Sequence, residues 1–322
     1  MSAPETVGDL LRGVSDDLAR HFDDVEVPAP FAYARRQATV APIDTPTDAP
    51  IDAPAVHWPH GRARAVVLAG PGVLAEPGGV RCVRTFAERA NVPVANTWGA
   101  KGVLRWDSPH HMGTCGLQAD DFALVGFGDY ELIVATGIDP VESPEERFGL
   151  APVSHISPMA LGAMTDVARL FDEIPSNDLY GRLASVAQPG YVDESFPRHP
   201  ARAVMDLKQS LGPETIVFGQ PGPVGLWLAR TFPTDRPGSI CVPAVDRPGI
   251  AAALALAARA TGLDAMAVTT DPVDEVSRAI VDAAPEGFRL ERWGDDVDWS
   301  RTRELVDAAG PVVAWSDPEE RP

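Results

Sequence analysis

Four residues after predicted buried strands have types and spacing that suit a ligand with phosphate groups. The turn Gly70-Pro71-Gly72 follows an apolar run and precedes a predicted helix, where backbone N–H groups bind phosphate oxygens. Gly137 and Asp139 follow a second apolar run, so all four are expected at one edge of a parallel sheet. The turn departs from Gly-x-Gly-x-x-Gly because position 75 is alanine, and Pro71 removes a donor, so a tight turn is favoured over a nucleotide site. The candidate cofactor-binding residues are Gly70, Gly72, Gly137 and Asp139.

Two other kinds of site, a zinc site and a cysteine nucleophile, have weaker support in the sequence. His110, His111 and Cys115 resemble a partial zinc ligand set, but a closed zinc site needs four ligands, so no metal site is predicted. A nucleophilic role for Cys115 has no support, because its catalytic partners cannot be inferred from adjacency in sequence. We interpret Cys115 as a small buried residue and assign no catalytic residue.

The remaining aromatic and acidic side chains are given structural roles. The run Glu142, Glu145 and Glu146 is interpreted as a solvated face. Six tryptophans are interpreted as core or interface anchors. They are Trp98, Trp106, Trp227, Trp293, Trp299 and Trp315.

Short apolar runs alternate with helical segments from residue 64 onward, which indicates parallel α/β architecture. The runs are continuously apolar, so helices are expected on both faces of each sheet. Strands are predicted over residues 65–69, 92–95, 131–136, 153–156, 215–218, 240–242, 265–268 and 312–315. Helices are predicted over residues 79–90, 201–211 and 273–283, around 226–228, and from 249. The predicted fold class is α/β, with two parallel-sheet Rossmann-like domains.

Proline clusters divide the chain. Apolar residues from Val7 to Phe22 recur at helical spacing and predict one short amphipathic helix that docks on another element. The proline repeat at 42–54 is interpreted as a linker, and the cluster at 188–200 as a domain boundary. The predicted organisation is an N-terminal helix and linker (1–60), a first α/β domain (61–190) and a second (191–322).

Composition excludes several classes of partner. The formal net charge of −19 opposes binding to nucleic acid or to anionic lipid. Cys82, Cys115 and Cys241 have no Cys-x-x-Cys spacing, which favours a reducing cytosol. The first twenty residues contain no apolar stretch typical of a secretory signal. The longest apolar run, 250–258, is far shorter than the ~20 residues that span a bilayer. A soluble cytoplasmic protein is expected.

Four segments taken together resemble a known family. Residues 66–73, 93–102, 111–116 and 131–142 resemble, in order and spacing, the central domain of acetolactate-synthase-like thiamine-diphosphate enzymes. The resemblance covers roughly residues 61–185 and implies a Rossmann-like fold. Residues 201–220 resemble the start of the family's cofactor-binding domain. Some relatives bind FAD, so the resemblance also implies a flavin or nucleotide as an alternative ligand.

The sequence departs from this family where the cofactor would be held. The family's cofactor-binding domain carries Gly-Asp-Gly followed by Asn, which bind the magnesium ion that anchors the diphosphate. No Gly-Asp pair of this chain is followed by Gly, and no Asn occurs after Asn177. The segment from Leu254 to Val268 has no such loop. Only about 60 residues precede the resemblance, so the family's pyrimidine-binding domain, with its activating Glu, is not expected here.

We expect a degenerate, noncatalytic or partner-dependent subunit. It would form a homo-oligomer, or a heteromer with a thiamine-diphosphate enzyme subunit. One alternative is half of a split carboligase or decarboxylase that acts on 2-oxo acids. Another is a sensor that binds a nucleotide or flavin. Thiamine diphosphate with magnesium, or a flavin or nucleotide, are the cofactors that the resemblance implies.

Overall fold

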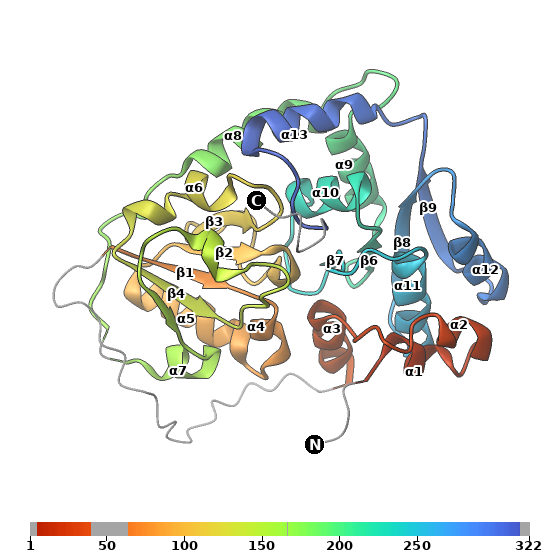
Figure 1. Ribbon diagram of the computed structural model, residues 1–322, viewed down its shortest axis with the longest axis horizontal. Helices are drawn as coiled ribbons and strands as arrows, with labels where there is room; N and C mark the ends of the chain where they lie inside the picture. Colours follow the sequence, from red (N-terminus) through yellow and green to blue (C-terminus); the bar gives the residue numbers. More distant parts are fainter. Residues whose placement is uncertain (1–4, 40–63, 166, 316–322) are drawn as a thin grey trace.

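The computed structural model describes residues 5–39, 64–165 and 167–315, and the described chain contains two parallel sheets (Figure 1). The first sheet has five strands in the order β3-β2-β1-β4-β5, all parallel. Its strands are β1 (Ala65–Ala69), β2 (Val94–Thr97), β3 (His111–Cys115), β4 (Leu132–Thr136) and β5 (Val153–His155). The second sheet has four parallel strands in the order β7-β6-β8-β9. They are β6 (Ile216–Gly219), β7 (Ile240–Cys241), β8 (Ala265–Thr270) and β9 (Arg289–Trp293).

Helices cover both faces of the first sheet, as continuous apolar strands require. Every residue of β1 is buried, and its alternate side chains enter two different clusters. Val67 packs with the cluster that contains Phe86, and Leu68 with the cluster that contains Phe122. The helices are α4 (Gly72–Ala75), α5 (Gly79–Ala90), α6 (Asp121–Val125) and α7 (Pro158–Ala163), with short 3-10 turns η1 (Trp98–Ala100), η2 (Phe127–Asp129) and η3 (Glu145–Phe148).

The second sheet is built in the same way. Its flanking helices are α10 (Pro223–Thr231), α11 (Ile250–Ala260) and α12 (Glu275–Ala283). Ala267 packs with α11 on one face of β8, whereas Met266 and Val268 enter the cluster that contains Trp227 of α10. The predicted α/β class with two parallel sheets is therefore confirmed.

One predicted strand is absent from the structure, and two observed strands, β3 and β9, were not predicted. Both unpredicted strands lie at sheet edges. Residues 312–315 are not a strand, since Val312 forms only an isolated antiparallel bridge with Gln118. The edge strand of the second sheet is instead β9, whose sequence Arg-Leu-Glu-Arg-Trp has no continuous apolar run. Strand β3 was also not predicted, because its His, Gly and Thr interrupt the apolar pattern.

Three helices connect the two sheets: α8 (Asp178–Tyr191), α9 (Pro200–Ser210) and α13 (Thr302–Ala309), the last preceded by η4 (Trp299–Arg301). Figure 1 shows α8 and α13 side by side across the top of the molecule, and their residues are in contact. Gln188, Pro189 and Gly190 lie inside α8, so the irregular segment between α8 and α9 is confined to residues 192–199.

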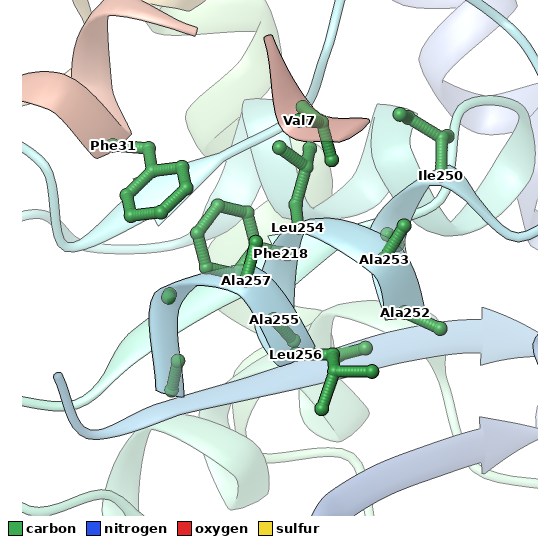
Figure 2. Packing of buried hydrophobic residues seen from close by; sticks show 14 of the residues in the cluster. Val7, Phe31, Phe218, Ile250, Ala252, Ala253, Leu254, Ala255, Leu256 and Ala257 are labelled. Atoms are coloured by element: carbon green, nitrogen blue, oxygen red, sulfur yellow. The ribbon is translucent and has the colours of Figure 1, made fainter. Parts of the chain in front are cut away.

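The N-terminal residues dock on the second sheet. The helix predicted from Val7 to Phe22 is two short helices, α1 (Val7–Leu11) and α2 (Asp16–Arg20), followed by α3 (Ala29–Thr39). Val7 and Phe22 are fully buried in one cluster with α11, whose residues from Ile250 to Ala258 are all buried (Figure 2). The expectation of docking is confirmed. The predicted linker at 42–54 lies outside the described residues.

None of the helices in the described ranges combines the length and the apolar character that a transmembrane span requires.

We expect Leu254→Ala to lower the free energy of unfolding by about 2–5 kcal/mol, because it removes a buried side chain and leaves a cavity. Leu254 is fully buried in the cluster that joins α1 to α11. Urea unfolding measures the effect. The matched control is Val281→Ala, which truncates an exposed aliphatic side chain of α12 and should stay within about 0.5 kcal/mol of the wild type. Equal effects of the two variants would contradict the packing described for α11.

Candidate functional site

The predicted cofactor-binding glycines meet at the switch point of the first sheet. The strand order runs from β1 to β2 and β3 on one side and to β4 and β5 on the other, so the crevice between β1 and β4 is where such folds bind ligands. Gly70 and Gly72 follow β1 and contact Gly137, which follows β4. A Cβ on Gly70 would lie 2.3 Å from the carbonyl oxygen of Gly137, so no side chain fits there.

Backbone hydrogen bonds already use two amides of this crevice. Gly70 N donates to Thr136 O at 2.9 Å, and Gly72 N donates to Gly137 O at 2.8 Å. Neither amide is available to a phosphate group in this conformation. Asp139 is half-buried nearby, and its Oδ1 accepts a hydrogen bond from Val141 N at 2.9 Å. Cofactor binding by Gly70, Gly72, Gly137 and Asp139 remains a prediction.

Glu142 is a buried carboxyl group at this sheet edge, which corrects its interpretation as part of a solvated face. It is 5% exposed, whereas Glu145 and Glu146 are exposed. Thr97 Oγ1 donates to Glu142 Oε2 at 2.5 Å, and Gly99 N donates to the same oxygen at 3.2 Å. Burial raises the pKa of Glu142 to about 8, and the charge of nearby Asp139 adds to the shift. Glu142 therefore joins the ends of β2 and β4 in its neutral form.

A buried ion pair links the two sheets. Arg230 of α10 and Asp121 of α6 are both fully buried, with Nη2 and Oδ1 2.5 Å apart. Arg230 also donates to Gln118 Oε1 at 2.9 Å and to Thr114 O at 2.6 Å. Gln118 Nε2 donates in turn to the carbonyl oxygens of Leu305 and Gly310, at 2.8 and 2.6 Å. This network satisfies the buried charges and fixes α6, α10 and α13 together.

Lys101 and His111 lie near the same interface. Lys101 is 7% exposed, and its pKa is lowered to about 7 by burial and by the positive charge of Arg230. Burial, with Lys101 as the second cause, lowers the pKa of His111 to about 4, so His111 is neutral at physiological pH. His111 Nε2 lies 3.1 Å from Asn96 Oδ1, and His110 Nδ1 lies 3.2 Å from the carbonyl oxygen of Val92. The two histidines are therefore held by separate partners, and the buried Cys115 has the small-residue role assigned to it.

The sequence contains a sign of this buried interface that the sequence analysis did not use. Lysine occurs only at Lys101 and Lys208 in a chain whose positive charge is otherwise arginine. A lysine shortly after a buried strand, at the end of the η1 turn, is therefore unusual here. Arg230 directly follows the apolar run 226–229, which was a second signal of burial. Glu142 gave no comparable signal, because it lies among residues that would suit a solvated loop.

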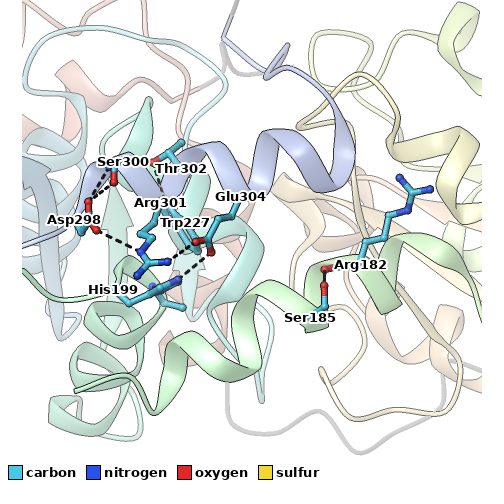
Figure 3. A network of polar contacts seen from close by, with 10 residues as sticks. Arg182, Ser185, His199, Trp227, Asp298, Ser300, Arg301, Thr302 and Glu304 are labelled. Carbon is cyan, nitrogen blue, oxygen red and sulfur yellow. Dashed lines mark hydrogen bonds and ion pairs between the residues drawn. The ribbon is translucent and has the colours of Figure 1, made fainter. Parts of the chain in front are cut away.

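A His–Glu pair among the helices beside the second sheet has a structural role. His199 Nε2 lies 3.4 Å from Glu304 Oε2, and Arg301 Nη1 donates to the other oxygen of Glu304 at 2.7 Å (Figure 3). His199 Nδ1 accepts a hydrogen bond from Ala201 N at 3.0 Å, and its ring packs edge-on against Trp227. The pair holds the start of α13 against α9 and α10.

The expected tryptophan anchors are mostly confirmed. Trp98, Trp227 and Trp293 are buried, and Trp299 and Trp315 pack partly buried against the same cluster. Trp106 is instead 45% exposed, because it lies in the turn-rich segment between β2 and β3.

The second sheet has a cavity of about 330 Å³ at its own switch point, between β6 and β8. It is lined by Gln220, Asp246, Pro248, Thr269, Thr270, Pro272 and Asp274. If the second sheet corresponds to the family's cofactor-binding domain, as the sequence resemblance predicts, a magnesium-bound diphosphate would be expected here.

The residues present do not fit that group. Asp246 and Asp274 are the carboxylates that line the cavity, and both oxygens of Asp274 accept hydrogen bonds from Ser277, from N at 2.9 Å and from Oγ at 2.6 Å. Within residues 5–39, 64–165 and 167–315, no three His, Cys, Asp or Glu side chains are grouped to hold a metal ion. A diphosphate without its cation would face two carboxylates, which repel it.

The comparison with known protein families found a match to the part of the chain that contains the first sheet. A family model described as the central domain of thiamine pyrophosphate enzymes matches residues 60–160, which contain β1 to β5. No curated protein matches the sequence. The first sheet and its helices form a Rossmann-like α/β unit. Its sequence is similar to that of thiamine-diphosphate enzyme central domains, which supports a relationship with that enzyme family.

We expect Arg230→Met to lower the free energy of unfolding by about 3–5 kcal/mol, because it leaves Asp121 buried without its cation. The double variant Arg230→Met with Asp121→Leu should recover part of this loss. As a control, Arg303→Met removes an exposed arginine 3.7 Å from Asp307 and should change stability by less than about 0.5 kcal/mol. Urea unfolding of all three tests the network. A loss below about 1 kcal/mol for Arg230→Met would contradict it.

Glu142 should make stability depend on pH. Its pKa is raised from 4.5 to about 8, so the native state holds a proton that the unfolded state releases. The free energy of unfolding should therefore fall as pH rises through this window, by up to about 1.4 kcal/mol per pH unit. Glu142→Gln should remove this part of the slope, and the exposed Glu146→Gln should not. Parallel pH profiles of the wild type and Glu142→Gln in urea unfolding would refute the assignment.

Proposed function

We propose that this protein is an acetolactate-synthase-like relative of the thiamine-diphosphate enzymes that acts as a noncatalytic or partner-dependent subunit. The observation that carries the proposal is the donor set of the second-sheet cavity. Its two carboxylates, Asp246 and Asp274, do not complete a three-ligand metal site with any other described residue. A catalytic member would need that ion to neutralise the diphosphate.

The two units themselves support a structural role. The first has a five-stranded parallel sheet, and the second has four parallel strands with their helices. The buried Arg230–Asp121 pair fixes one unit against the other. A scaffold with two complete sheets, but without a complete set of metal ligands among the described residues, suits a chain that acts in assembly.

Exposed apolar side chains support a partner. Phe196 is 80% exposed and Val192 is 74% exposed, both in the segment between α8 and α9. Leu150 is fully exposed after the η3 turn. We propose that these residues contribute to contacts with a second copy of the chain or with a thiamine-diphosphate enzyme subunit, in the cytoplasm.

We expect the isolated chain to show no binding of thiamine diphosphate with magnesium at micromolar concentrations, because the metal ligands are incomplete. Isothermal titration calorimetry on the full chain measures this. A genuine thiamine-diphosphate enzyme titrated under the same conditions is the positive control. Clear micromolar binding by the isolated chain would overturn the proposal.

Purification from the native host, followed by mass spectrometry and light scattering, completes this test. The expected result is a homo-oligomer or a heteromer with a thiamine-diphosphate enzyme subunit. If adding that subunit produces turnover of a 2-oxo acid, the chain is partner-dependent; if it does not, the chain is noncatalytic. A monomer that co-purifies with no such subunit would contradict the proposed role.

A further inference from the structure

Thr269 places a hydroxyl group at the wall of the second-sheet cavity, and this group has no hydrogen-bond partner among the described residues. Thr269 lies on the face of β8 that carries Ala265 and Ala267 and packs against α11. It is 3% exposed and lines the cavity. Its hydroxyl makes no hydrogen bond to any side chain or backbone group in the described part of the chain. A hydroxyl group at the wall of a polar cavity favours a ligand that can hydrogen-bond to it.

The charge of the cavity selects against anions. Asp246 and Asp274 line it, and no Lys, Arg or His side chain is among the described lining residues. Arg247 lies between two lining residues, but its guanidinium donates to Asp24 Oδ1 and Oδ2 at 2.6 and 2.7 Å. The net charge of −19 adds long-range attraction for cations.

The wall of the cavity is held in place by the N-terminal helices. Besides its pairing with Asp24, Arg247 Nη1 donates to the carbonyl oxygen of His21 at 2.8 Å. Gln220 Nε2 donates to Arg247 O at 2.9 Å, and Gln220 Oε1 accepts from Ala251 N at 3.3 Å. The segment that contains Asp246 and Pro248 is therefore fixed from both sides, so a ligand would not have to order it.

We propose that this cavity binds a small organic cation that carries a hydroxyl group, with Asp246 and Asp274 facing the positive charge and Thr269 bonded to the hydroxyl. The volume of about 330 Å³ is within the range of small-molecule sites. The inference goes beyond the proposed function and holds whether or not a partner chain supplies catalysis. It states that the sheet edge accepts the charge opposite to that of a diphosphate.

Two probes that differ only in their tail separate the alternatives. Thiamine is an organic cation with a free hydroxyl group, and thiamine diphosphate carries the same ring with an anionic tail. Calorimetric titration of the full chain in a chelator, without divalent metal, should show thiamine binding at least about tenfold tighter than thiamine diphosphate, because only the latter is repelled. Choline, a second hydroxylated cation, should also bind.

Variants assign the binding to this cavity. Thr269→Val removes the hydroxyl while keeping the shape, and should weaken thiamine about fivefold with an unchanged unfolding midpoint. Asp246→Asn should weaken it and reduce its salt dependence. The control Asp282→Asn changes an exposed acid of α12 outside the cavity and should have no effect.

Three results would overturn the inference. They are no binding of thiamine or choline at millimolar concentration, tighter metal-free binding of thiamine diphosphate than of thiamine, and binding that Thr269→Val and Asp246→Asn leave unchanged. The test of the proposed function is separate, because it measures thiamine diphosphate with magnesium present.

Discussion

The arrangement of the two sheets depends on one buried ion pair, Arg230 with Asp121. Transfer of two charges into the interior is costly unless each finds a partner and further hydrogen bonds. Here the arginine binds a carboxylate, a side-chain amide and a backbone carbonyl, and Gln118 extends the network to two carbonyl oxygens of the α13 region. The two units therefore have one relative orientation in which the charges are satisfied. A sliding or rotated packing would leave a buried charge unpaired, so the interface selects its geometry by electrostatics as well as by apolar contact.

The sequence predicted the interior strands well because burial on both faces leaves a continuous apolar run. Strands β1, β4, β6 and β8 all have this pattern and lie inside the sheets, with neighbours on both sides. Of the four edge strands, β5 and β7 were predicted, whereas β3 and β9 were missed because polar residues interrupt their apolar pattern. Residues 312–315 were wrongly predicted as a strand because their apolar character serves a different contact. Val313 and Ala314 are buried against other elements, and Val313 N donates to the carbonyl oxygen of Leu117 in the first unit.

The candidate site was only partly predictable. The glycines were placed correctly at one sheet edge, because turn chemistry after a strand is local and can be read from spacing. Whether their amides are free is a tertiary property, and Gly72 N is bonded to Gly137 O from a strand distant in sequence. Glu142 illustrates the same limit. Its neighbours Glu145 and Glu146 are exposed, and only the contacts with Thr97 and Gly99 across the sheet place Glu142 inside.

The two switch points of this molecule have opposite consequences for ligands, although they share one topology. In the first sheet the crevice is closed by glycine contacts so tight that even a Cβ would clash with backbone. In the second sheet the crevice is open, and acids line it. The topology fixes where the strand ends separate, but the residues at those ends decide whether the gap is filled and which charge it accepts. A parallel sheet can therefore be kept intact while its ligand chemistry changes, since residues such as Thr269 and Thr270 end β8 without disturbing its pairing with β6 and β9.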